Sequence, residues 1–317
     1  MAATNPPPQP RIAGAEALAQ AADLLLSGNI VAVPTETVYG LAARADDPAA
    51  VAAIYRAKRR PAFNPLIVHV LDQAAAAPLA LFDGRAERLA RAFWPGPLTL
   101  VLPRRPDAPL APAVYAGQRT VALRSPAHSM LRALLERTGL ALAAPSANPS
   151  GGISPTRAEH VAAGLGGEVP LILDGGPCEA GVESTIVALR DGGRWQVLRP
   201  GPIAEAAVAA VLGSGAIEAR PGGAVEAPGQ LASHYAPAKP LRLAAAHVDD
   251  DEFLIGFGAI AGDISLSAAG DLAEAAARLY ACLHEADSAA KPRIAVAPIP
   301  QCGIGIALND RLRRAAA

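Results

Sequence analysis

Two pairs of polar residues in this chain have the types and the spacing needed to bind an anion. Lys58 and Arg60 are separated by one residue, and Ser146 and Asn148 repeat that spacing between two prolines. An ammonium makes a point contact to a phosphate or carboxylate oxygen, whereas a guanidinium can hold a second oxyanion through two parallel hydrogen bonds. Hydroxyls and backbone donors in a loop of small residues can also meet a phosphate. The two pairs are therefore candidates for phosphate or carboxylate chemistry.

The basic run at residues 58–60 also has a purely structural explanation. Positive side chains at a helix C-terminus interact favourably with exposed carbonyls, for about 0.3–1 kcal/mol each, and one or two would suffice. A lysine at position 58 is nevertheless unusual here, because only Lys58, Lys239 and Lys291 among the 28 basic residues are lysine. This segment alone leaves an anion site and an ordinary helix end as equal alternatives.

Three clusters of small and polar residues follow candidate strands, at residues 143–156, which contain Ser146 and Asn148, and at residues 174–185 and 198–202. Each alone is typical of a turn whose Ser and Asn side chains bond their own backbone. Arg199, in the third cluster, is by itself typical of a solvated arginine in a stiff turn. Open α/β sheets bind ligands where strand ends and their loops converge, so the recurrence of such clusters favours one shared site.

The elements around the first pair follow from local signals. Residues 30–33 form an apolar, β-branched strand that Pro34 stops, and residues 46–48, Asp-Asp-Pro, supply the cap of a helix. That helix must end near Pro61, because the residue before a proline is pushed out of the α region, and residues 66–70 predict the next strand. We therefore expect Lys58, Arg59 and Arg60 on the last helical turn.

The rest of the chain has an α/β pattern, in which apolar strand candidates alternate with Ala-rich amphipathic stretches. A chain of 317 residues exceeds what one core usually holds and suggests two domains. Residues 220–240 are rich in Gly and Pro without periodicity, which is typical of a linker. The predicted strands before that linker span residues 98–102, 120–123, 141–144, 171–173 and 185–189, and those after it span 241–243, 253–257 and 293–297, with a helix at 272–284.

Composition excludes several classes of protein. The net charge is −1 and the pI about 6.6, so no global basic surface for gripping a nucleic acid is expected. The three cysteines are far apart and have no C-x-x-C spacing, which argues against a zinc site or a disulfide framework and favours a reducing compartment. Neither a signal peptide nor a bilayer-spanning run is found, so we expect a cytoplasmic protein with no membrane association.

The motifs occur in the order seen in the YrdC-like family: PTETVYGL, the Lys58/Arg60 pair, NPLIVH, WPGPLT, the Ser146/Asn148 pair, GVEST and LRPGP. HYAP at residues 234–237, with APIP and NDRLRRAAA near the C-terminus, resembles the two-domain long form of threonylcarbamoyl-AMP synthase. The resemblance implies an α/β fold with a YrdC-like twisted open mixed sheet, helices and a concave cationic cleft. A small C-terminal Rossmann-like α/β domain would follow.

Combined with the composition, the resemblance implies four segments. These are a disordered leader at 1–10, a YrdC-like catalytic domain at 11–219, the linker at 220–240 and the small α/β domain at 241–317.

The reaction that the resemblance implies joins L-threonine, bicarbonate and ATP into threonylcarbamoyl-adenylate and pyrophosphate, the first step of threonylcarbamoyl-adenosine modification of tRNA next to the anticodon. Such a nucleotidyltransferase would use Mg²⁺ with ATP and no organic cofactor. A separate tRNA-modifying transferase would receive the product, and direct tRNA binding would be weak or absent, as the near-neutral charge suggests. The alternative is a nucleotide- or RNA-binding module without synthase activity.

The family pattern also implies roles for individual residues. Arg124 would clamp the threonine carboxylate, while His69, which alternates with apolar neighbours, has a hydrogen-bonded core histidine as its alternative. No carboxylate cluster suggests metal ligands, so none is assigned. The catalytic residues would be Lys58, Arg60, Ser146 and Asn148; the ATP-binding residues Arg60, Asn64, Thr120, Ala144, Ser146, Ser154, Arg199 and Tyr235; and the threonine-binding residues Thr37, His69, Arg124 and Ser184.

Overall fold

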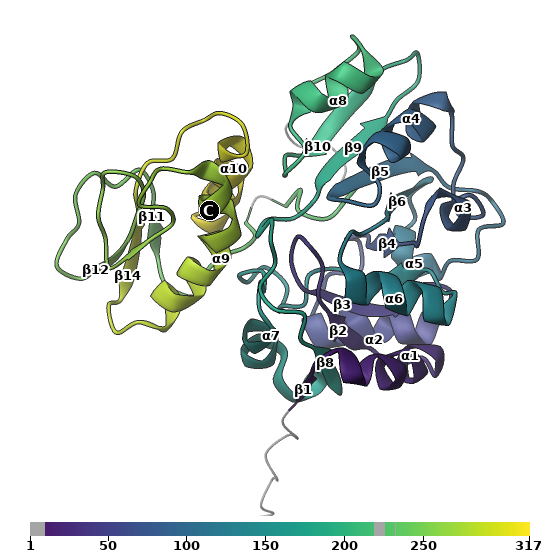
Figure 1. Cartoon of the computed structure of the whole chain (residues 1–317), viewed down its shortest axis with the longest axis horizontal. Coiled ribbons are helices and arrows are strands. Elements are labelled where there is room, and N and C mark those ends of the chain that lie inside the picture. The colour runs from purple at the N-terminus through teal and green to yellow at the C-terminus, as the bar shows by residue number, and fades with distance from the viewer. Residues whose placement is uncertain (1–9, 219–225, 232) are drawn as a thin grey trace, which may run out of the picture.

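The computed structural model describes residues 10–218, 226–231 and 233–317, which form a large α/β unit and a smaller one (Figure 1). Nearly all of the expected leader at 1–10 and part of the expected linker at 220–240 lie outside the described residues. The described linker residues belong to no helix or strand. The expected α/β class with a second, smaller α/β domain is confirmed.

The large unit is built on one mixed sheet of ten strands, in the order β1-β8-β2-β3-β7-β4-β6-β5-β9-β10. Some neighbours are parallel, such as β4 and β6, and others antiparallel, such as β9 and β10. The strands are β1 (Arg11–Ala13), β2 (Val31–Val33), β3 (Gly40–Arg44), β4 (Ile67–His69), β5 (Leu98–Pro103), β6 (Thr120–Arg124), β7 (Leu142–Ala143), β8 (Leu171–Leu173), β9 (Thr185–Leu189) and β10 (Trp195–Arg199).

Helices cover both faces of this sheet. Successive residues of a strand point to opposite faces, so one strand contributes side chains to the apolar clusters on both sides. Val31 and Val33 pack with α1 and α6 in one apolar cluster, whereas Ala32 belongs to another that includes α2 and α4. Both clusters are closed to water, so the strands are apolar on both sides. The helices are η1 (Ala15–Ala17), α1 (Leu18–Leu26), α2 (Pro48–Lys58), α3 (Gln73–Ala76), α4 (Gly84–Phe93), α5 (Pro112–Tyr115), α6 (Ser129–Thr138), α7 (Ala158–Leu165), η2 (Gly166–Glu168) and α8 (Glu205–Leu212).

Helix α2 begins where the sequence predicts but ends two residues early. The Asp47 side chain accepts hydrogen bonds from the backbone of the first turn, and Pro48 occupies the first helical position. Lys58 is the last helical residue, and Arg59 takes a left-handed conformation with φ of 52°. The expectation that Arg59 and Arg60 lie on the last turn is therefore wrong, because the left-handed residue turns the chain out of the helix.

Four strands were not predicted, at residues 11–13, 40–44, 195–199 and 264–265. Gly40–Arg44 contains no β-branched residue, yet it pairs with β2 on one side and β7 on the other. Trp195–Arg199 pairs with β9 through a register shift after Val197. Arg199 is therefore the last residue of a strand, and the prediction that it lies in a turn is wrong.

The smaller unit has a four-stranded parallel sheet in the order β11-β14-β12-β13. Its core is formed with α9 and α10, which Figure 1 shows together on the side facing the large unit. Helix α9 runs to Ser288, four residues beyond the prediction. The elements are β11 (Leu241–Arg242), β12 (Glu252–Gly256), β13 (Ile264–Ser265), α9 (Leu272–Ser288), β14 (Arg293–Val296) and α10 (Gly305–Ala315).

The two units touch closely at Gly181. Its φ is +65°, and a Cβ placed there would lie 2.2 Å from the Ala276 oxygen and 2.4 Å from the Ala277 Cα, both in α9. Neither backbone atom can move aside without shifting the helix. The first glycine of GVEST is thus required both by its conformation and by the approach of α9.

We expect Gly181→Ala to lower the free energy of unfolding by about 2–5 kcal/mol, the sum of left-handed strain and overpacking. Gly176→Ala is the matched control, since its φ is +80° but nothing lies within 4 Å of the new Cβ. It should cost only about 1–2 kcal/mol. Urea unfolding of both variants measures the difference, and equal losses would contradict the close packing at Gly181.

Candidate functional site

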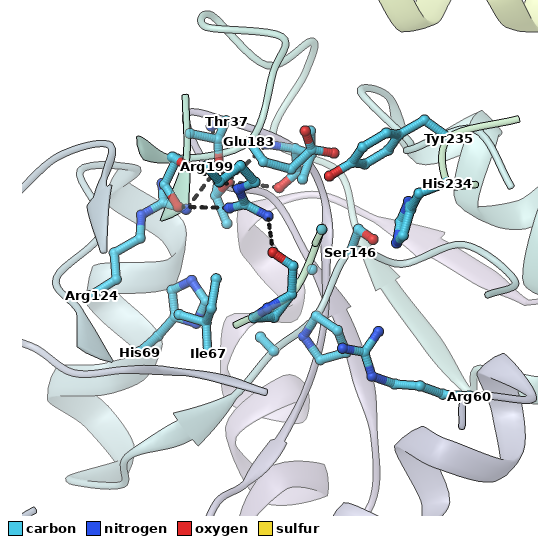
Figure 2. A pocket seen from close by; sticks show the side chains of 18 residues that line it. Thr37, Arg60, Ile67, His69, Arg124, Ser146, Glu183, Arg199, His234 and Tyr235 are labelled. Carbon is cyan, nitrogen blue, oxygen red and sulfur yellow. Dashed lines mark hydrogen bonds between the residues drawn. The ribbon is translucent and has the colours of Figure 1, made fainter. Parts of the chain in front are cut away.

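One cavity collects most of the residues that the sequence singled out. The side chains around it leave a cavity volume of about 40 Å³. Figure 2 shows Arg124 and His69 on one side of it and His234 and Tyr235 on the other. Nine of the predicted site residues line the cavity, from segments spread over nearly 200 positions of the chain: Thr37, Arg60, His69, Arg124, Ala144, Ser146, Ser184, Arg199 and Tyr235.

Four other predicted residues support the lining from behind. Lys58 and Asn148 flank the Ser146 segment, and the Asn64 carbonyl accepts a hydrogen bond from Arg60 Nε at 3.1 Å. Ser154 Oγ donates to the carboxylate of Glu183 at 2.6 Å. Thr120 is at the start of β6, at the opposite end of that strand from Arg124, and it does not line this cavity.

Lys58 fixes the segment that carries Ser146 and Asn148. Its Nζ donates to the Ser146 carbonyl at 2.6 Å and to the Asn148 carbonyl at 2.5 Å. The side chain is 1% exposed, and burial together with the charge of Arg60 holds its pKa well below the ordinary value. The helix-end explanation is therefore wrong for Lys58, because the acceptors belong to a loop 88 and 90 residues away.

Arg60 lies at the cavity wall, with its guanidinium on backbone carbonyls of the next segment. Nε and Nη2 donate to the carbonyls of Asn64 and Pro65, and burial lowers the pKa of Arg60 to about 10. Asn148 orders the opposite loop, since its Nδ2 donates to the carbonyls of Pro149 and Gly152 at 2.8 Å each. The two motif pairs are thus joined through hydrogen bonds to main-chain oxygens.

Arg124 and His69 are neighbours because β4 and β6 are parallel and pair in register at these two residues. The Arg124 guanidinium donates to Thr37 Oγ1 at 2.9 Å and forms an ion pair of 2.7 Å with Glu36. Burial and the charge of Arg124 lower the pKa of His69 to about 3, so its ring is neutral. Its Nδ1 has no hydrogen-bond partner in the described structure. His69 lines the cavity, which does not favour the alternative of a histidine in the closed core.

Arg199 and Ser184 hold each other at the far wall. Arg199 Nε donates to the Ser184 carbonyl and Nη2 to its Oγ, both at 3.1 Å, and the Ser184 hydroxyl is also 2.7 Å from Thr99 Oγ1. Arg199 is 3% exposed, so the expectation of a solvated surface arginine is wrong. Tyr235 lies beside them with φ of +65° and a buried hydroxyl that has no partner in the described structure.

Two acidic residues of the site were not predicted from the sequence. Glu36 pairs with Arg124, and Glu183, which lines the cavity, pairs with Arg311 at 2.8 Å. Burial alone would raise the pKa of Glu183, but the charges of Arg311 and Arg199 lower it to about 2. Glu183 belongs to the GVEST cluster, so its position was visible in the sequence. Its role was not, because its partner follows 128 residues later.

The cavity is suited to a ligand with more than one anionic group. Arg60, Arg124 and Arg199 line it and are each at least 91% buried, while the two nearby acids are already paired with arginines. Buried cations of this kind favour a carboxylate or phosphate partner. Among the described residues no group of three or more His, Cys, Asp or Glu could hold a metal ion.

The chain matches the family described as telomere recombination over residues 23–201, and the family described as threonylcarbamoyl-AMP synthase, C-terminal domain, over residues 203–317. It is 40% identical to the threonylcarbamoyl-AMP synthase of Bacillus subtilis, over 94% of this chain and 92% of that protein. The Pyrococcus abyssi synthase is 37% identical over 93% of this chain and 92% of its own length.

The fold is similar to the crystal structure of P. abyssi Sua5 complexed with L-threonine. The TM-score is 0.88 at 35% sequence identity, over 96% of this chain and 97% of that one. In the part of the chain that the structure describes, helices fall short of the length and apolar character needed to cross a membrane.

Glu183 should make stability depend on acid pH. Its folded pKa of about 2 lies below the ordinary 4.5, so its stabilising effect is complete above pH 4.5 and disappears as the pH falls through about 2. The effect is on the order of 3 kcal/mol. We expect the free energy of unfolding to fall less between pH 6 and pH 3 in Glu183→Gln than in the unchanged chain, as measured by urea unfolding. Exposed Glu168→Gln is the control, and the same slope in all three proteins would contradict the pairing.

Proposed function

Because this chain belongs to the YrdC-like family, in its two-domain threonylcarbamoyl-AMP synthase form, we propose that it joins L-threonine, bicarbonate and ATP into threonylcarbamoyl-AMP and pyrophosphate. It is a nucleotidyltransferase of tRNA modification. The match over both domains does not favour a binding module without synthase activity.

One observation of the structure carries this proposal: three buried arginines line a single cavity. Arg60 donates to two main-chain carbonyls. Arg199 donates to the carbonyl and the hydroxyl of Ser184 and to the carbonyl of Pro228, so the partners of both guanidinium groups are neutral oxygens. A buried charge is costly unless a partner compensates it. The carboxylate of an amino acid and the phosphates of a nucleoside triphosphate supply anionic groups for such a cavity.

The threonine subsite lies at the ends of β4 and β6. Arg124 would hold the carboxylate, and Thr37, His69 and Ser184 would contact the amine and the hydroxyl. A neutral His69 adds no charge to repel the amine, and its free Nδ1 can accept a hydrogen bond from it. A site that bonds the substrate hydroxyl can reject an amino acid without one far more strongly than a methyl difference allows.

The nucleotide would occupy the other side of the cavity. Arg60 and Ser146, which line the cavity, would face the phosphates there, and Tyr235 would cover the site. Lys58 bonds the carbonyls of Ser146 and Asn148 and so keeps the loop of Ser146 in place. The remaining residues of the ATP set are Asn64, Thr120, Ala144, Ser154 and Arg199. Asn64 and Ser154 act through their hydrogen bonds to Arg60 and Glu183, and a contact from Thr120 is carried only by the motif resemblance.

The chemistry requires positioning more than covalent work. The threonine amine attacks the bicarbonate carbon, and the C–OH bond breaks so that water, formed from that hydroxide and an amine proton, leaves and a carbamate remains. A carbamate oxygen then attacks the α-phosphate, and pyrophosphate leaves with the electron pair of the broken P–O bond. Arginine donors fixed in a water-poor cavity can offset the charge that develops on the phosphate oxygens. Enclosure by Tyr235 and His234 would also protect the product anhydride from hydrolysis.

Mg²⁺ enters this scheme with ATP as part of the substrate. The described acids at the site are engaged by arginines, and Mg²⁺ at phosphates usually keeps several waters and takes few protein ligands. No organic cofactor is needed for the reaction. The adenylate would pass to a separate tRNA-modifying transferase in the cytoplasm, and the net charge of −1 fits weak or absent tRNA binding by this chain itself.

The proposal is tested by pyrophosphate release from the purified chain with L-threonine, bicarbonate and ATP-Mg²⁺. We expect release that depends on threonine and on bicarbonate, together with a new adenylate that mass spectrometry identifies by its mass. L-alanine in place of threonine is the control, because it lacks the hydroxyl. Release no higher than without threonine would refute the synthase function.

Arg124→Lys should separate the two subsites. Lysine keeps a charge for Glu36 but loses the forked grip on a carboxylate. Losing a charged hydrogen bond of about 1.5–3 kcal/mol should raise the KM for threonine roughly 10- to 100-fold and change that for ATP little. Steady-state kinetics with each substrate varied in turn measures both values. A larger increase in the KM for ATP would mean that the two subsites are assigned the wrong way round.

A further inference from the structure

Arg311 of α10 carries a buried charge from the smaller unit into the wall of the site. It is 0% exposed. Its Nε donates to the Glu183 carboxylate at 2.8 Å, and its Nη2 donates to the Pro200 carbonyl at 2.9 Å and the Glu183 carbonyl at 3.4 Å. One planar guanidinium therefore bonds two separate segments of the large unit.

Those two segments carry a pair of site residues. Ser184 follows Glu183 and Arg199 precedes Pro200, and Ser184 and Arg199 bond each other directly. Arg311 thus holds the backbone immediately beside both residues. Its guanidinium carbon is also 5.4 Å from the ring centre of Tyr235, which covers the same cavity.

The carboxylate of Glu183 is shared between the two units. Ser154 Oγ donates to it from the large unit, and the Tyr280 hydroxyl of α9 contacts both oxygens at 2.9 and 3.1 Å. Three donor groups, the Ser154 hydroxyl, the Tyr280 hydroxyl and Arg311 Nε, satisfy this one buried acid through four contacts, so its orientation is fixed from both sides. Glu183 is also part of the cavity lining.

Docking of the smaller unit does not by itself need this charge. Val182, Val38, Ile153 and Tyr235 of the large unit and linker already belong to one apolar cluster with α9 and α10. A buried ion pair adds little net stability compared with well-packed apolar residues, whereas its hydrogen bonds impose a defined geometry. Because Arg311 bonds the residues next to Ser184 and Arg199, the geometry that it imposes extends to these two site residues.

We propose that Arg311 is a positioning residue for the reaction, through which the smaller unit sets the places of Ser184 and Arg199. The inference rests on the proposed function, since these two residues belong there to the threonine and ATP subsites respectively. Arg311 is not among the residues that line the cavity. It acts by holding Glu183 and Pro200, so its loss should weaken the use of both substrates together.

The experiment compares Arg311→Met, Arg311→Lys and Tyr280→Phe in full-length protein. Displacement of site groups by about 1 Å can cost on the order of 10²-fold, so we expect Arg311→Met to lower kcat/KM for threonine and for ATP by about that factor. Arg311→Lys restores a charge opposite Glu183 but not the fork, and should recover part of the loss. Tyr280→Phe removes one hydroxyl and keeps the aromatic ring in place. It should lower kcat/KM for threonine and for ATP as well, but by a smaller factor than Arg311→Met.

Arg242→Met is the matched control, because it breaks an ion pair of the smaller unit with the fully buried Glu252, away from the cavity. It should lower the melting temperature and leave kcat/KM unchanged. The proposal is overturned if Arg311→Met, folded at the assay temperature, stays within about threefold of the unchanged chain, or if Arg242→Met reproduces its kinetic loss. If Arg311→Met does not fold, Arg311→Lys and Tyr280→Phe decide, and unchanged constants in both overturn it.

Calorimetric titration with L-threonine and with ATP-Mg²⁺ separates this proposal from the function on which it rests. If the unchanged chain binds both ligands and releases no pyrophosphate, the synthase function fails. The Arg311 proposal is then decided by affinity: it stands if Arg311→Met weakens the binding of both ligands, and it falls if either affinity is unchanged.

Discussion

Burial of positive charge around one cavity is the constraint on which the rest of this structure depends. Lys58, Arg60, Arg124 and Arg199 are each at least 91% buried, and a buried charge must be compensated by something the fold supplies. Only Arg124 is paired directly with an acid, Glu36. Lys58 and Arg60 rest instead on main-chain carbonyls, so the loops that carry those carbonyls must be ordered wherever the charges are. This is a physical reason for the prolines on either side of Ser146 and Asn148.

The mixed sheet converts this requirement into a site by bringing several strand ends to one edge. His69 and Arg124 end two parallel strands in register, and Thr185 begins the strand that pairs with β5 next to them. The antiparallel partner of β9 ends at Arg199, which therefore returns to the same edge. Residues from four strands can meet there although their positions in the sequence differ by more than 100.

The sequence indicated which residues form the site better than it indicated which hydrogen bonds and ion pairs connect them. The pairs around Lys58 and Ser146 were recognisable because their residue types are unusual for their surroundings, and the strands with β-branched residues were recognisable by pattern. Gly40–Arg44 was not, because pairing with neighbours rather than propensity makes it a strand, and Trp195–Arg199 was not predicted although it contains Trp and Val. The acceptors of Lys58 are backbone carbonyls, which no side-chain pattern reveals. Glu183 was visible, but burial and a partner in α10 exist only in the folded chain.

The acid at Glu183 links assembly of the two units to order in the site. Without α9 and α10 beside it, the carboxylate would lack the Tyr280 and Arg311 donors and would need water in their place. Docking exchanges that water for donors that also bond the segment after Arg199. The apolar contacts of α9 and α10 supply the driving force for docking. The directional hydrogen bonds of Arg311 then set the positions of the segments at Glu183 and Pro200. Closing the interface and setting the positions of Ser184 and Arg199 are consequently one event.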